Sequence, residues 1–240
     1  MLIRRWPDTP EQRERLLALR DDLLLETVDV ASTAGGVGDD HGDGLAERFR
    51  QDDGPFTAYE RTVTADPESS ELVESTSYTM SIPWFGWLFR RPVRRVLARN
   101  GSHQSWWAPP DRLDATQLLV VGLLAAASMS AAFVNTLFTQ TVNFAADDFG
   151  ISDTGIGIAG AVVRAGILIA LPAAIIADRI GRRRVIVTVA WLGPLLSLLG
   201  ALAPSFVILV ATQTVARPMG IALAFLVGVV ASEEMPRNSR

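Results

Sequence analysis

The sequence predicts an all-α membrane protein preceded by a small α+β region, and two observations support this. The part from Asp114 onwards holds four long apolar runs, with only 15 charged side chains in 127 residues. Residues 1–82, in contrast, carry 18 acidic and 8 basic side chains, which is typical of a water-exposed region. We therefore expect a soluble region over residues 1–110 and a membrane domain over residues 114–240.

The four apolar runs have the length that membrane helices need. A helix requires about 20 apolar residues to cross a hydrocarbon core of roughly 30 Å. The runs cover residues 118–138, 154–177, 185–202 and 206–230, and their only charges are Arg164 and Arg217. We expect membrane helices at about 116–140, 153–177, 184–203 and 205–231.

The arginines outside these runs predict how the chain is oriented. They precede the first run, separate the second from the third, and follow the fourth, whereas the other two connections contain no base. They include Arg90, Arg91, Arg94, Arg95, Arg99, Arg179, Arg182, Arg183, Arg184, Arg237 and Arg240. The positive-inside rule then places both termini in the cytoplasm, and we expect a multi-pass protein of the cell membrane.

The loop between the second and third runs resembles a known family. It reads Asp178-Arg179-Ile180-Gly181-Arg182-Arg183. This resembles the signature loop of the major facilitator superfamily, Gly-x-x-x-Asp-Arg/Lys-x-Gly-Arg-Arg/Lys, and it occupies the same place between the second and third helices.

Two weaker matches follow. Arg217-Pro218-Met219-Gly220 resembles the family's Arg-x-x-x-Gly pattern in the fourth helix, with the glycine one place early. Glu233, Pro236 and Arg240 resemble the Glu-x-x-Pro-x-x-x-Arg loop after that helix.

The resemblance implies the first four helices of a major facilitator half-bundle, in a family whose members have twelve helices. It implies a secondary active transporter of small solutes, such as drugs in efflux. Transport would be by alternating access, driven by an ion gradient, with protons as the expected ion. The remaining helices, or a second chain, would be needed as a partner. By the same resemblance, a conformational latch would comprise Asp178, Arg179, Gly181, Arg182, Arg183 and Glu233, with Glu233 or Glu234 pairing with an arginine.

Polar residues inside the apolar runs are candidates for substrate or ion contacts. An arginine at the centre of a membrane helix costs about 2.5–3.5 kcal/mol on insertion scales, so it is usually found facing a cavity or a partner. Arg164 and Arg217 are in this position, and Asn135 and Gln140 are weaker candidates. Alternatively, backbone carbonyls neutralise the arginines, and Pro218 frees one such carbonyl. Gly155, Gly157 and Gly160 are expected to let helices approach closely.

A second function class stays open: a non-transporting module in which the helices anchor a cytoplasmic lipid- or protein-binding region. We expect no enzyme and no nucleic-acid partner. We also expect no metal or other cofactor, since cysteine is absent and His41 and His103 stand alone.

The first 110 residues predict a mixed fold. Thr9 and Pro10 begin a helix that should reach about Glu26, and residues 31–54 should be loose. Residues 56–64 and 72–82 predict a hairpin. Residues 84–99 combine tryptophan with arginine, which favours either a helix at the lipid headgroups or a helix packed on the hairpin. Strands followed by a helix faintly resemble the end of a START-like or polyketide-cyclase-like domain.

Overall fold

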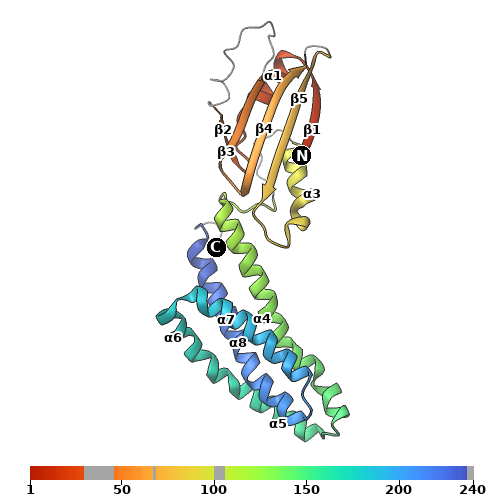
Figure 1. Ribbon diagram of the computed structural model, residues 1–240, viewed down its shortest axis with the longest axis vertical. Helices are drawn as coiled ribbons and strands as arrows, with labels where there is room; N and C mark the ends of the chain where they lie inside the picture. Colours follow the sequence, from red (N-terminus) through yellow and green to blue (C-terminus); the bar gives the residue numbers. More distant parts are fainter. Residues whose placement is uncertain (30–45, 67–68, 100–105, 237–240) are drawn as a thin grey trace. The chain divides into compact units, whose positions relative to one another are not determined.

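The computed structural model describes residues 1–29, 46–66, 69–99 and 106–236 (Figure 1). His41, His103, Arg237 and Arg240 lie outside these ranges. The chain forms two compact units. The first comprises residues 1–122 with the residues from Met235 on, and the second comprises Leu123–Glu234.

The first unit is built on a five-stranded antiparallel sheet. The strands are β1 (Leu2–Pro7), β2 (Leu25–Val28), β3 (Ala46–Asp53), β4 (Phe56–Asp66) and β5 (Glu71–Met80), in the order β1-β5-β4-β3-β2. The predicted hairpin is confirmed as β4 and β5, whose register places Tyr59 opposite Tyr78. The other three strands were not predicted, and β3 contradicts the expectation that residues 46–53 are loose.

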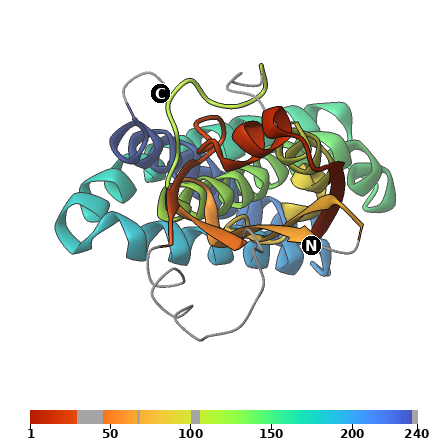
Figure 2. The ribbon, with the colours of Figure 1, turned by 90° about the horizontal axis from the view of Figure 1, so that it is seen from above.

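Two helices cover one side of this curved sheet, α1 (Pro10–Leu17) and α3 (Gly86–Leu97) (Figure 2). The predicted start of α1 is confirmed, since the Thr9 hydroxyl accepts a hydrogen bond from the Gln12 N–H at 3.3 Å. The predicted end near Glu26 is wrong. The chain turns instead, because the Arg20 and Glu26 backbones are joined at 3.0 Å and Glu26 enters β2.

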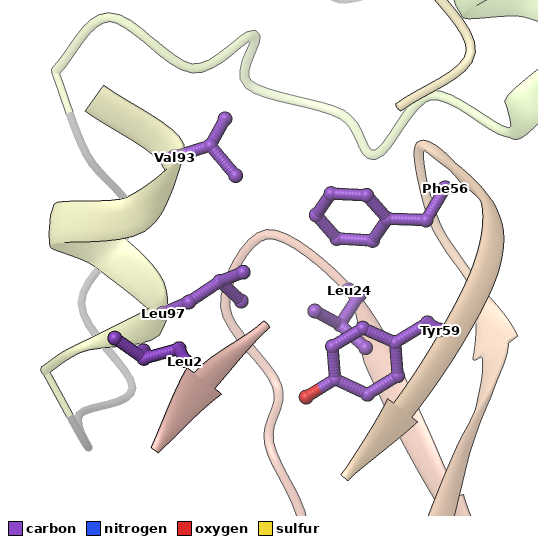
Figure 3. Packing of buried hydrophobic residues seen from close by; sticks show 6 residues of the cluster. All are labelled: Leu2, Leu24, Phe56, Tyr59, Val93 and Leu97. Atoms are coloured by element: carbon purple, nitrogen blue, oxygen red, sulfur yellow. The ribbon is translucent and has the colours of Figure 1, made fainter. Parts of the chain in front are cut away.

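The covered face of the sheet holds two apolar clusters. Beside α1, Leu16 packs with Phe49, Val63 and Leu72. The second cluster places α3 on the sheet, with Val93 and Leu97 directed towards strand and loop residues (Figure 3). Its buried members are Leu2, Leu24, Phe56, Tyr59, Val93 and Leu97. The expected helix over residues 84–99 is therefore present, and one of its faces is packed on the sheet.

A group of buried charges joins the two clusters. The Arg61 guanidinium lies over the Phe49 ring, 4.2 Å from its centroid, and also pairs with Glu26. Glu26 in turn accepts a hydrogen bond from the Tyr59 hydroxyl at 2.6 Å. Glu74, on β5, lies between Arg61 and Arg4. The interior of this unit thus contains paired charges as well as apolar side chains.

The second unit is helical. Its elements are α4 (Ala115–Asp148, which begins in the first unit), α5 (Asp153–Ala165), the 3-10 turn η1 (Gly166–Ile169), α6 (Ala170–Ile180), α7 (Arg182–Ala201) and α8 (Phe206–Glu234). In the described part of the chain, α4, α7 and α8 are long and apolar enough to cross a membrane. With 34 residues, α4 is about 51 Å long and extends beyond the predicted end near residue 140.

The second predicted span is not one continuous α-helix, because η1 interrupts it. Pro218 in α8 has no N–H to donate to the Thr214 carbonyl four residues earlier. That carbonyl lies so close to Gly166 that a Cβ there would be 2.4 Å from it. The irregular turn and the proline of α8 therefore face each other. A four-helix half-bundle is not confirmed, and this segment's crossing of the membrane stays a prediction.

Close approach between helices depends on small residues at other positions than those predicted. A Cβ on Gly200 of α7 would lie 2.7 Å from the Thr212 hydroxyl of α8. A Cβ on Gly220 of α8 would lie 3.1 Å from the Asn135 side-chain oxygen of α4. Among the described residues, Gly157 and Gly160 have no neighbour within 4 Å of a built Cβ, and Gly155 meets only Ile151 and Ser152, so the expected helix contacts of these glycines are not present there.

Candidate functional site

The turn between α6 and α7 forms the candidate site. The amide of Gly181 donates to the Ala177 carbonyl at 3.0 Å, which closes the last turn of α6. Gly181 itself has φ +99°, a conformation that residues with a Cβ rarely adopt. Because of this reversal, α7 begins at Arg182, and its first side chain lies close to the end of α6.

Arg182 links three segments of the chain. Its Nε lies 3.5 Å from the Asp178 Oδ1 in α6, and its Nη1 donates to the Glu233 Oε2 near the end of α8. Three residues of the predicted latch, from α6, α7 and α8, are thus in contact. Their role as a latch stays a prediction.

These ion pairs are open to solvent. The side chains of Arg182, Asp178 and Glu233 are 35%, 68% and 55% exposed. Exposed pairs contribute little to stability and are screened by salt, so this contact is easily exchanged for another. Arg179 and Arg183, the other two arginines of the predicted latch, are exposed and have no ion pair among the described residues.

The opposite end of this unit is acidic and apolar. Asp147, Asp148 and Asp153 lie where α4 ends and α5 begins. Phe206, at the start of α8, contacts Phe149 edge to face, with ring centroids 6.4 Å apart. The arginine-rich turn and the acidic turn therefore lie at opposite ends of the unit (Figure 1).

The mid-span candidates are spread over three helices and do not form one cluster of contacts. Arg164 and Gln140 are exposed, whereas Arg217 and Asn135 are half-buried. Within the described residues, neither arginine has a carboxylate partner. Arg164 lies two residues before Gly166, and Arg217 precedes Pro218, so both flank the place where η1 faces α8.

Two further polar residues were not predicted. Ser197 of α7 and Gln213 of α8 are buried, and the Oγ of Ser197 and the Oε1 of Gln213 have no hydrogen-bond partner in the described part of the chain. The Oδ1 of Asn135 is in the same situation. Buried polar atoms normally have a partner. The signal available in the sequence was the presence of polar side chains inside both of these apolar runs.

Comparison with known proteins adds no relative. The chain matches no protein-family model, and no curated protein or solved structure matches it either. Among the residues described, no group of three or more histidine, aspartate or glutamate side chains is placed to hold a metal ion.

Proposed function

We propose that this chain forms the N-terminal part of a secondary active transporter of small solutes, of the major facilitator type. The observation that supports this most is the contact of Arg182 with Asp178 and Glu233 at the arginine-rich end. This contact joins the motif residues of the turn between α6 and α7 to the end of α8.

The proposed mechanism uses the weakness of this contact. A partner bundle, from further helices or from a second chain, competes for the exposed charges of Asp178, Arg182 and Glu233. Arg179 and Arg183 offer it additional positive charge. Exchange of these pairs closes and opens the cytoplasmic side, as alternating access requires.

The centre of the unit supplies the substrate and coupling contacts in this proposal. Arg217 is adjacent to Pro218, which has no N–H to donate to the Thr214 carbonyl, at the place where α8 faces η1. Discontinuous helices at mid-depth are typical of transporter binding sites. An anionic group on the substrate, or a titrating carboxylate from the partner bundle, would pair with Arg217 or Arg164.

The test uses everted membrane vesicles from cells that express the complete reading frame encoding these residues. A pH-sensitive dye reports proton movement while a panel of small solutes is added. We expect at least one solute to dissipate the pH gradient, and Asp178→Asn or Arg217→Ala to abolish the response. Asp148→Asn, the same charge change at the acidic end, should leave the response unchanged.

Solute-driven ion movement that survives both Asp178→Asn and Arg217→Ala would contradict the roles assigned to these residues. Vesicles that respond to no solute, although the protein is present in the membrane, would favour the anchored-module alternative.

A further inference from the structure

Helix α3 has a second face that no described residue covers. Val93 and Leu97 pack on the sheet, whereas Trp87 is 72% and Leu88 is 51% exposed. Arg91, Arg94 and Arg95 are exposed as well. At 100° per residue, Leu88, Arg91 and Arg95 fall on the side of the helix opposite Val93 and Leu97, and Trp87 and Arg94 lie on its flank. We call these five residues the outer face of α3.

The outer face is strongly cationic. The helix carries four arginines, including Arg90, and no acidic residue. None of the four is ion-paired within the described part of the chain. Arginine in this free state binds phosphate oxygens with several donors at once. The exposed apolar residues Trp87 and Leu88 lie at the start of α3, and the arginines follow them. Helices that lie at the surface of anionic bilayers have such a composition.

The turn before α3 directs one more tryptophan outward. Trp84 has φ +56°, which is uncommon for a bulky residue, and it is the centre of a tight turn closed by the Phe85 N–H and the Pro83 carbonyl at 2.6 Å. Its side chain is nevertheless 70% exposed. Neither burial nor a described contact accounts for this strained placement, and tryptophan is the side chain that is enriched among lipid headgroups.

The helix is held firmly on its unit, so docking of α3 would fix the whole unit. The Arg20 guanidinium donates to the carbonyls of Val96 and Leu97 at 2.9 Å each and to that of Arg99 at 3.1 Å. Arg4 donates to the carbonyls of Leu97 and Ala98. The C-terminal carbonyls of the helix are thereby satisfied from the sheet side.

The chain also keeps this unit close to a bilayer. Trp107 packs against the cluster that contains Val93, Arg112 pairs with Asp21, and the apolar helix α4 begins at Ala115. Residues 108–114 can span at most about 25 Å even when fully extended. A unit that is tethered this closely meets the leaflet at a high effective concentration.

We propose that the outer face of α3, together with Trp84, docks on the anionic leaflet of the same membrane that α4 crosses. The arginines bind lipid phosphates, and Trp84, Trp87 and Leu88 insert at headgroup depth. This proposal requires α4 to span the membrane, but it does not require the chain to transport anything.

The absence of cysteine provides a direct test on the full chain. Leu88→Cys is labelled with a polarity-sensitive fluorophore, and the chain is reconstituted in vesicles of phosphatidylcholine with or without phosphatidylglycerol. We expect the label to become brighter, blue-shifted and quenchable by spin-labelled lipid when phosphatidylglycerol is present. The matched site is Ser77→Cys, on the uncovered face of β5, whose label should stay in water.

The dependence of docking on the arginine charges is tested in the Leu88→Cys background. The triple variant Arg91→Gln, Arg94→Gln, Arg95→Gln should lower the docked-to-undocked ratio about fivefold per arginine. The triple variant Arg5→Gln, Arg48→Gln, Arg50→Gln makes the same change in net charge at exposed arginines of the sheet and should leave the ratio unchanged.

Three outcomes would overturn the proposal. The label at residue 88 could remain as exposed to water as that at residue 77 in anionic vesicles. It could be buried equally in uncharged vesicles. It could also be buried in detergent as protein concentration rises, which would indicate a second copy or another protein as the occupant.

Discussion

Arg61 and Glu26 form a two-point ion pair inside the α+β unit, with Nε–Oε1 at 2.8 Å and Nη2–Oε2 at 2.6 Å. Both side chains are almost fully buried, at 1% and 0% exposure. Arg61 also donates to the Leu16 and Ala18 carbonyls at 2.8 and 3.2 Å, so it connects the end of α1 to the sheet.

Removing one partner of this pair should destabilise the unit strongly. Arg61→Met leaves the Glu26 carboxylate buried without its main partner, and such a loss costs about 3–5 kcal/mol. The double variant Arg61→Met, Glu26→Leu leaves no charge unpaired at this position and should recover most of that loss. Hydrogen exchange of the β4 amides in the full chain measures the unfolding free energy. A double variant as unstable as Arg61→Met alone would contradict this account.

Stability should also fall at high pH because of Tyr59. Burial, and then the neighbouring Glu26 charge, raise the pKa of the Tyr59 phenol far above its usual range. The folded state therefore keeps the phenol neutral, whereas the unfolded chain ionises near pH 10. The stabilisation is complete below that pH and decreases above it, by up to about 1.4 kcal/mol per pH unit.

Tyr59→Phe removes this titration, so its stability should depend less steeply on pH between about 10 and 11, although it loses the hydrogen bond to Glu26. Urea midpoints measured across this range provide the comparison. Tyr78→Phe serves as the control and should keep the steeper dependence, because Tyr59 is still present. Equal slopes for the unaltered protein, Tyr59→Phe and Tyr78→Phe would exclude Tyr59 as the cause of the pH dependence.

Arg20 should hold the C-terminal end of α3 in place. Burial lowers the pKa of Arg20, but the hydrogen bond and charge of Asp22 outweigh it, so the pKa is raised and the side chain stays charged. Arg20→Leu removes a charged donor from Asp22 and from the Val96, Leu97 and Arg99 carbonyls, although Leu97 keeps Arg4 and Val96 keeps the Arg99 N–H. We expect the free energy of unfolding to fall by about 3–5 kcal/mol. Faster hydrogen exchange of the amides in Gly86–Leu97 would show this loss. Arg48→Gln, at an exposed pair, should not change that exchange.

The buried charges also explain which strands the sequence could predict. β4 and β5 were predicted because two strand-like runs flank a polar turn, and Tyr78, Met80 and Ile82 alternate with polar residues. β1 and β2 were missed because Arg4 and Glu26 occupy covered or buried positions, where alternation rules expect apolar residues. The leucines up to Leu25 suggested a longer α1, but the turn that ends it depends on contacts between Arg20 and Glu26.

In the helical unit, hydropathy located the apolar runs but not their continuity. The break at Gly166 lies against Thr214 and Pro218 of α8, which are far away in sequence, so hydropathy along one run could not indicate it. At the candidate site, the motif located Asp178 and Arg182, whereas the choice of Glu233 as the second partner of Arg182 depends on where α8 ends.

The contact between Arg182 and Glu233 can be tested by distance. Spin labels on Ile180→Cys and Ser232→Cys, both exposed positions in a cysteine-free chain, report the separation of the ends of α6 and α8. We expect Arg182→Gln to broaden the distance distribution, because it removes the link between these ends. Arg183→Gln, the neighbouring change without an ion pair in the described residues, should not broaden it. Identical distributions for both variants would show that Arg182 does not connect the helices.

The same substitution at two glycines of the second predicted span should have opposite effects. In α5, Gly157 faces open space, so Gly157→Ala should stabilise the protein by about 0.5–1 kcal/mol through helix propensity. At the start of η1, Gly166→Ala would place a Cβ 2.4 Å from the Thr214 carbonyl, so the helices must separate and stability must fall. Thermal unfolding of the two variants in the same detergent measures the difference. If Gly166→Ala were as stable as Gly157→Ala, η1 would not pack on α8 at Thr214, and the break in the helix would need another cause.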